Sequence, residues 1–254
     1  MKKSLVPGVL IALSALSSCL NFAQPVLACG TYGSKYFDQF DQEDGVMRGK
    51  QWVSVTSKGW LIAQDMDSGV VKNYGSFGRR LLPYLDVRGG RACVVTTNEI
   101  CIISLKTGRI LQAKEHTLGR CSVGMIDHRT VFLNNGKKLV VMDMISGRTQ
   151  DEIDLIPSGS PQRRLTKEQL VISHARRGDL VYVARPQVRG VAVVDLNKRE
   201  KVQEITRGLG CPHQLRLYGS RLSVEHSFPT AASGQELLSF VDVVRGDIQT
   251  SALN

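Results

Sequence analysis

The 254-residue chain has few aromatic residues, few prolines and no long uninterrupted apolar segment. A membrane-crossing helix needs about 20 consecutive apolar residues, so the composition excludes a multi-pass membrane protein. Only 8 prolines accompany 24 glycines, and this balance favours tight turns over a proline-rich linker. Hydrophobic residues still make up 42% of the chain, which is enough for a sizeable core and excludes a disordered protein.

The signature motifs of common catalytic and metal sites are also missing. The chain contains no G-x-S-x-G, no H-E-x-x-H and no phosphate-binding glycine loop, so no catalytic residue is predicted. It has neither C-x-x-C-H nor paired C-x-x-C, which argues against covalent haem and structural zinc. His116, His213 and His226 lack the spacing of metal ligands, so neither a metal nor another cofactor is expected.

Positive charge is in excess. Lysine and arginine number 33 against 23 aspartates and glutamates, for a formal net charge of +10. Such a surplus is compatible with an anionic partner, although a basic surface can also have no specific ligand. Nucleic acid is not an expected partner, because no stripe of basic and aromatic residues is present.

The first residues resemble a bacterial secretory signal. Two lysines follow Met1, and a short apolar run interrupted by serines extends from residue 5 to about residue 20. We favour cleavage after Ala28, which makes residues 1–28 a signal peptide and residues 29–44 a lead-in. The alternative is a lipoprotein signal over residues 1–18, with Cys19 of Leu-Ser-Ser-Cys lipidated. Either form predicts an extracytoplasmic protein (periplasmic, secreted or anchored on the outer surface), with membrane contact only through that lipid.

Export permits disulfide bonds, but six cysteines are too few for a disulfide scaffold. Cys93 and Cys101 lie on consecutive strands of one expected hairpin and are the disulfide candidate. They face each other if the turn has three loop residues centred on Thr97, and lie on opposite sides if it has two. The sequence leaves both registers open.

An internal repeat is the most informative feature. Three stretches align without gaps, and each reads as apolar strand, polar turn, apolar strand and a D/S-x-x-S/T-G turn: WVSVTSKGWLIAQDMDSG (52–69), RACVVTTNEICIISLKTG (91–108) and TVFLNNGKKLVVMDMISG (130–147). Their final glycines lie 39 residues apart. Two looser copies, over 180–199 and 221–246, follow after insertions and carry Asp195 and Asp242 at the aspartate position.

Further short strands flank each copy. We expect inner strands at 84–87, 123–126, 170–173 and 215–218, and outer strands after the turns at 70–72, 109–111 and 200–202. Runs such as Ile100–Ile103 are apolar at successive positions and must be covered on both faces. No copy has room for a crossover helix, so neighbouring sheets must provide the cover. Four strands per repeat of about 40 residues predict a β-propeller over residues 45–254.

The repeated V-x-D-x-x-T/S-G pattern resembles the YVTN-type and quinoprotein-like propeller repeats of exported bacterial proteins. Cys211-Pro212-His213 resembles the proline-led start of an inner strand in that family. The resemblance implies an all-β fold of about five four-stranded antiparallel blades, as a closed ring, an open arc or part of a larger ring. A β-sandwich is the alternative. The tryptophan that commonly ends the repeat in quinone-binding members is missing here, so the quinone cofactor is not carried over.

The loops that lead into the inner strands of a propeller share one face with the turns between second and third strands. These loops carry arginines, which bind carboxylates and phosphates. We therefore expect a ligand-binding ring of Arg79, Arg120 and Arg207 with His213. The predicted function is a non-enzymatic exported scaffold that binds a protein or a small anionic ligand through this face. The alternative is a propeller enzyme of the quinoprotein-like, lactonase-like or glycan-cleaving class.

Overall fold

The computed structural model describes residues 42–56, 59–76, 84–156, 158–160, 172–227, 236–245 and 248–252. The expected signal peptide, Cys19 and the lead-in up to residue 41 lie outside these ranges, as does Arg79. Within them the chain is all-β apart from one turn of 3-10 helix, η1 (Pro186–Val188). The described part contains no helix with the length and hydropathy of a membrane span.

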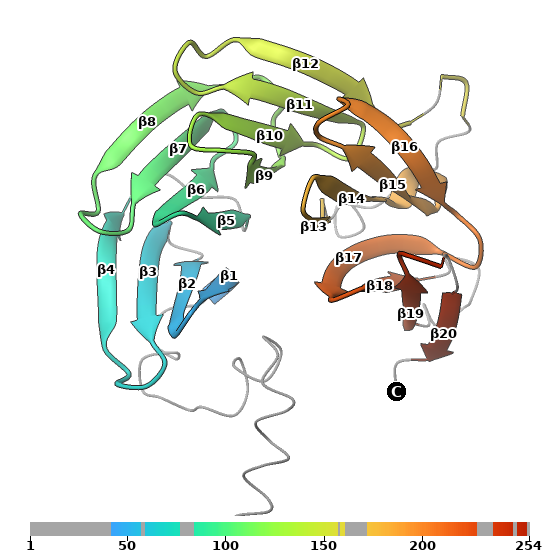
Figure 1. The fold of residues 1–254 in the computed structure, drawn as a ribbon, viewed down its shortest axis with the longest axis horizontal. Helices are drawn as coiled ribbons and strands as arrows, with labels where there is room; N and C mark the ends of the chain where they lie inside the picture. The colour runs from blue at the N-terminus through green and yellow to red at the C-terminus, as the bar shows by residue number, and fades with distance from the viewer. Residues whose placement is uncertain are drawn as a thin grey trace, which may run out of the picture.

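Twenty strands form five four-stranded antiparallel sheets, and each sheet is made from four consecutive strands (Figure 1). Blade 1 contains β1 (Gln42–Arg48), β2 (Gln51–Thr56), β3 (Trp60–Asp65) and β4 (Val71–Ser76). Blade 2 contains β5 (Leu85–Arg88), β6 (Arg91–Val95), β7 (Glu99–Ser104) and β8 (Ile110–Glu115). Blade 3 contains β9 (Ser122–Met125), β10 (Thr130–Asn134), β11 (Lys138–Asp143) and β12 (Thr149–Asp154).

The last two sheets follow the same order. Blade 4 contains β13 (His174–Arg177), β14 (Leu180–Arg185), β15 (Gly190–Asp195) and β16 (Glu200–Ile205). Blade 5 contains β17 (Cys211–Tyr218), β18 (Arg221–Ser227), β19 (Glu236–Asp242) and β20 (Ile248–Ala252). The five sheets are arranged as a five-bladed β-propeller, which confirms the predicted fold and excludes the β-sandwich. The blades follow an arc that is open between blade 1 and blade 5 (Figure 1).

Three of the four predicted inner strands and all three predicted outer strands are confirmed. The inner strand of blade 4 is the exception, because it was expected at 170–173 but begins only at His174. Residues 170 and 171 lie outside the described ranges, and Ile172 and Ser173 precede the strand. The apolar residues at 170–173 predicted a strand there, but the strand begins where His174 pairs with Val183 on β14.

The repeated turns have the predicted chemistry. Asp143 Oδ1 accepts hydrogen bonds from the backbone N–H of Ile145 and Ser146, at 2.9 and 2.7 Å. Asp65, Asp195 and Asp242 cap their own turns in the same way. The glycine of each of the first three turns has a positive φ of 70 to 76°. Arg199 occupies this place in blade 4 with φ 59°, a backbone conformation that is unfavourable for any residue except glycine.

The core is divided among the junctions between blades. Within the described residues, four hydrophobic clusters join blades 1 and 2, 2 and 3, 3 and 4, and 4 and 5. Strands such as β7 and β11 contribute alternate side chains to two different clusters, which explains their uninterrupted apolar runs. Ile102, for example, packs toward blade 3, and its neighbour Ile103 packs toward blade 1.

Candidate functional site

One end of the propeller carries the loops that lead into the inner strands together with the turns between second and third strands. His116 ties two such loops together: its backbone N–H donates to Asn98 O at 2.8 Å, and its Nε2 lies 3.1 Å from Thr96 O. Thr96 and Asn98 belong to the β6–β7 turn, whereas His116 follows β8. We call this end of the molecule the loop face.

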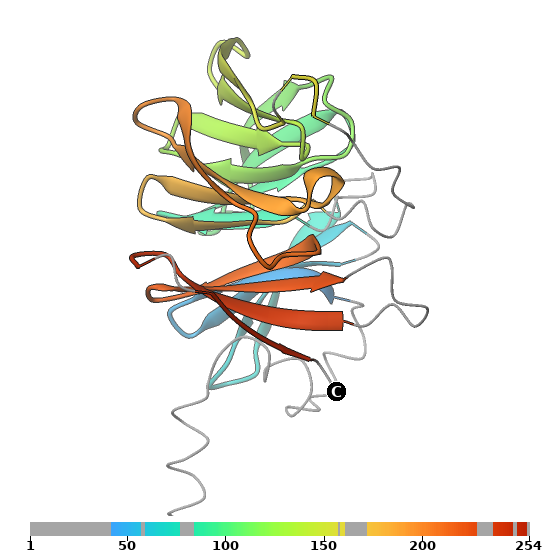
Figure 2. The same cartoon turned by 90° about the vertical axis from the view of Figure 1, so that its right-hand side faces the viewer.

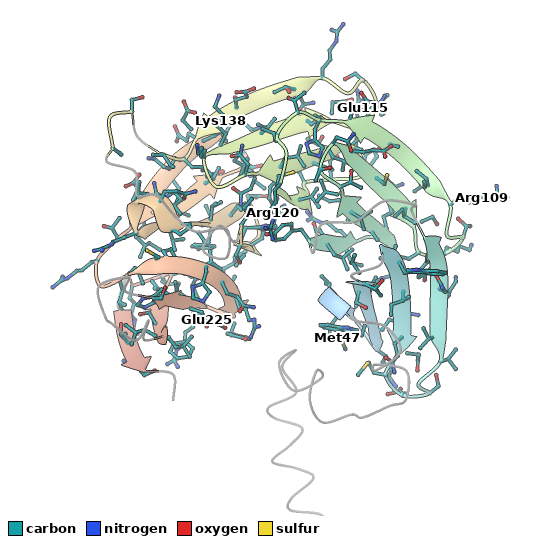
Figure 3. The ribbon with its side chains drawn as sticks, turned by 180° about the vertical axis from the view of Figure 1, so that it is seen from behind. Met47, Arg109, Glu115, Arg120, Lys138 and Glu225 are labelled. Atoms are coloured by element: carbon teal, nitrogen blue, oxygen red, sulfur yellow. The ribbon has the colours of Figure 1, made fainter. Side chains whose placement is uncertain are left out.

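The sequence-predicted arginines occupy different parts of the loop face. Arg120 is exposed in the loop between β8 and β9, on the concave side of the arc (Figure 3). Arg109, which lies between β7 and β8 and was not a predicted site residue, projects from the convex side in the same view. Arg207 is exposed in the loop between β16 and β17. His213 is half-buried on β17, near the start of the strand. Arg120 and Arg207 make no ion pair with any described residue, so both charges face solvent.

The histidines of the loop face have structural partners. Leu118 N–H donates to His116 Nδ1 at 3.3 Å, so His116 is the tautomer that carries its proton on Nε2. Gly210 N–H donates to His226 Nδ1 at 3.1 Å and fixes the same tautomer there. Burial lowers the pKa of both rings, which keeps them neutral at pH 7. Within the described ranges no three His, Cys, Asp or Glu side chains are grouped to hold a metal ion.

The proposed disulfide between Cys93 and Cys101 is wrong. Thr96 N–H donates to Glu99 O at 2.8 Å, so the hairpin closes through a two-residue loop. Cys93 is then paired with Ile102, and Cys101 with Val94, which directs the two thiols to opposite faces of the sheet. Cys93 packs between blades 2 and 3, and Cys101 packs between blades 1 and 2. Both are buried and outside any disulfide, as are Cys121 and Cys211.

A groove of about 680 Å³ separates the outer parts of blades 4 and 5. Figure 2 views this side of the molecule, with blade 5 in red beside blade 4 in orange. Apolar side chains of β14, β16, β19, β20 and the turn after β19 form its walls: Tyr182, Ile205, Val241, Ile248 and Val243. Arg207, one of the sequence-predicted arginines, lies in its lining together with Thr206 and Gly208.

A hydrogen-bond chain reaches the groove from the buried interior of blade 5. His226 Nε2 lies 2.7 Å from Ser239 Oγ, and Ser239 Oγ lies 2.7 Å from Thr250 Oγ1. His226 and Ser239 are fully buried, whereas Thr250 is exposed and lines the groove. Sequence analysis did not single out Ser239 or Thr250. The only visible signal was a serine within the apolar strand LLSFVD.

A buried arginine was also missed. Arg185, at the end of β14, is completely inaccessible to solvent, and its Nη1 lies 3.0 Å from Glu204 Oε1 and also donates to Leu155 O of blade 3. Lys201 contacts the same carboxylate, and Lys201 and Arg185 together lower the pKa of Glu204. The side chain therefore joins blades 3 and 4, and it neutralises the acidic residue next to the groove.

Sequence comparison identifies no relative: no protein-family model and no curated protein matches the chain. Similarity to solved structures is nevertheless extensive. The chain matches the β-propeller domain of Cps50 (Swd1) from Myceliophteria thermophila with a TM-score of 0.61 and 13% identity, covering 84% of this chain and 71% of that one. It also matches the computationally designed protein Ika8, with a TM-score of 0.55, 12% identity and shares of 83% and 61%.

A third match is hydrazine synthase from Kuenenia stuttgartiensis, with a TM-score of 0.50, 15% identity and shares of 67% and 49%. The chain thus spans less than two thirds of the length of two of these three proteins. Identities of this size carry the fold alone, and they support no assignment to the YVTN-type family in particular. The strand order, the repeated turns and these matches together show that the chain is a β-propeller.

Proposed function

We propose that the chain is an exported, non-enzymatic binding scaffold that recognises a protein or a small anionic ligand through its loop face. The β-propeller fold is commonly a binding scaffold, because its loops vary on a rigid frame. Export follows from the resemblance of residues 1–28 to a secretory signal. The observation that carries the proposal is the pair of exposed guanidinium groups of Arg120 and Arg207 on one end of the molecule, neither of which has an ion-pair partner among the described residues.

The chemistry of the loop face favours binding over catalysis. A general base there would need a basic side chain within reach of substrate. His116 and His226 accept a backbone N–H at Nδ1 and have a protein partner at Nε2, so neither ring has a lone pair available to take a proton from a substrate. The four described cysteines are buried, and burial raises the pKa of Cys121 to about 12, so they are poor nucleophiles.

Two double variants, each with two arginines replaced by alanine, test the proposal. Arg120→Ala with Arg207→Ala removes two positive charges from the loop face, and Arg109→Ala with Arg148→Ala removes two exposed charges from the turns at the opposite end. The purified chain is titrated with citrate, phosphate and glucuronate and with proteins of the extracytoplasmic fraction, by calorimetry and by pull-down. The mass of the same preparation shows whether it starts at Cys29 or carries lipid on Cys19.

We expect to find a ligand whose affinity is about tenfold or more lower in the variant with Arg120→Ala and Arg207→Ala than in the natural chain. The reason is that a charge-assisted hydrogen bond contributes about 1.5–3 kcal/mol. The control pair should bind that ligand as the natural chain does. Binding that is equally sensitive to both pairs would contradict a loop-face site. Turnover of a sugar, lactone or amine substrate would contradict the non-enzymatic assignment.

A further inference from the structure

The groove between blades 4 and 5 is bordered by two strands with an unpaired edge. Within the described sheets β16 pairs only with β15, and β20 pairs only with β19. Residues of both strands line the groove: Gln203, Glu204 and Ile205 of β16, and Ile248, Gln249 and Thr250 of β20. An edge strand presents a row of backbone N–H and C=O groups that an extended polypeptide can satisfy.

The hydrogen-bond chain sets whether the hydroxyl of Thr250 acts as a donor or as an acceptor in the groove. Because Gly210 N–H occupies His226 Nδ1, the His226 proton lies on Nε2 and is donated to Ser239 Oγ. The Ser239 hydroxyl hydrogen then has one acceptor among the described residues, Thr250 Oγ1. Thr250 accepts this bond, so its own hydrogen is available to a group in the groove. The buried chain thus makes Thr250 a donor that suits a carbonyl or carboxylate oxygen.

The acidic and basic side chains that line the groove differ in whether they have partners. The carboxylate of Glu204 is held by Lys201 and Arg185, and Asp242 Oδ1 accepts the N–H groups of Val244 and Arg245 in its own turn, at 2.9 and 3.0 Å. Arg207 makes no ion pair with a described residue and is exposed. The end of the groove near the loop face therefore has an uncompensated positive charge, which favours a carboxylate in that place.

We propose that this groove binds an extended peptide segment of a partner protein, which lies along β20 and places an acidic side chain or its terminal carboxylate at Arg207. Thr250 donates to a backbone carbonyl of the segment, and the apolar walls at Tyr182, Ile205 and Ile248 receive every second side chain. The volume falls within the range of protein ligand sites. This inference rests on the proposed function and names its partner as an extended acidic peptide.

Peptide selection on the purified full-length chain provides the test. A phage-displayed library of random 12-residue peptides is selected, and the enriched peptides are synthesised and titrated by calorimetry. Two variants probe the groove: Arg207→Gln removes the charge, and Thr250→Val removes the hydroxyl at constant shape. Two matched controls lie elsewhere: Arg109→Gln in the exposed turn between β7 and β8 at the opposite end, and Thr149→Val, an exposed threonine on the outer strand of blade 3. A fifth variant, Arg120→Gln on the loop face, separates the groove from the wider loop-face site. Circular dichroism confirms that all five variants fold.

We expect enriched peptides to contain aspartate or glutamate. Arg207→Gln should weaken their binding about tenfold or more, and Thr250→Val about threefold to tenfold, as for the loss of a charged and a neutral hydrogen bond. Both controls should bind like the natural chain. The inference is overturned if no peptide is enriched, or if binding survives both groove variants. Binding that is lost only in Arg120→Gln would refute the groove and leave the proposed loop-face function standing.

Discussion

Gly124 on β9 has no side chain at the point where Phe132 of the neighbouring strand crosses it. The two residues are directly paired, and a Cβ on Gly124 would lie 2.3 Å from Cζ of the Phe132 ring. The ring can therefore lie flat over the inner strand and reach His174 of blade 4, with 5.1 Å between ring centroids. A glycine inside a strand marks a close approach of this kind.

The first prediction concerns this contact. Gly124→Ala should lower the free energy of unfolding by about 1–3 kcal/mol, because an extra methyl group overpacks a closed site. Phe132→Leu should remove most of that penalty, so the double variant should be less destabilised than the sum of the two single variants. Urea denaturation of the four proteins measures the coupling. Strict additivity would show that the alanine does not meet the ring.

At the scale of elements, the inner strands are joined across blade junctions by buried polar contacts. His174 on β13 places Nδ1 at 2.9 Å from Ser122 Oγ on β9, and Asn134 Nδ2 of β10 lies 3.2 Å from the same oxygen. Asp86 of blade 2 accepts the N–H of Met125 at 2.6 Å, and Arg88 donates to Ile126 O at 2.7 Å. Neighbouring blades are thus held by hydrogen bonds at the centre and by apolar packing farther out.

The second prediction is a dependence of stability on pH. Burial, with a smaller contribution from Arg176, lowers the pKa of His174 to about 4, below its ordinary value of about 6.5. The unfolded chain therefore binds a proton that the folded chain excludes, and stability falls as the pH decreases from 6.5 to 4. The contribution is about 3 kcal/mol at most. Urea denaturation at several pH values should show this loss in the natural chain and a smaller one in His174→Gln.

His128→Gln is the control, because His128 is exposed in the β9–β10 turn. It should keep the pH dependence of the natural chain. Part of the slope should remain in His174→Gln, since burial also lowers the pKa of His116 and His226. An unchanged slope in His174→Gln would contradict the assignment of this loss to the junction of blades 3 and 4.

At the scale of the whole molecule, blade 3 and blade 5 differ in how many of their faces pack against a neighbouring blade. Blade 3 contributes to two hydrophobic clusters, one on each face. Among the described residues blade 5 contributes to one, which it shares with blade 4. Its other face carries the half-buried side chains of Arg216, Glu225 and Phe240, with Arg216 Nη1 3.8 Å from Glu225 Oε1. Each repeat in such an array is stabilised by its neighbours.

The third prediction follows from this arrangement. Amide hydrogen exchange measured by mass spectrometry should be slower in β10 and β11 than in β18 and β19, because blade 5 can open without disrupting two junctions. Peptides that cover each pair of strands provide the comparison within one experiment. Equal protection of the two blades would indicate that the ring is closed against blade 5 in solution.

The repeat, and with it the fold, could be predicted from local sequence patterns. Strand alternation, the turn aspartates and the positive-φ glycines are local properties, so their recurrence predicted most of the twenty strands and the five blades. The fourth inner strand was misplaced because its start depends on pairing with β14. The register of one hairpin, left open by the sequence, excluded the Cys93–Cys101 bond once a two-residue loop fixed it.

The groove between blades 4 and 5 could be found only in the folded chain. Arg207 was visible in the sequence as one arginine among several in the loops. Its place beside Thr250 depends on how far blades 4 and 5 separate at their outer strands, which no local pattern encodes. The chain of Gly210, His226, Ser239 and Thr250 likewise joins residues of different strands. Donor direction and uncompensated charge are properties of side chains brought together by folding, and they distinguish this groove from the rest of a basic surface.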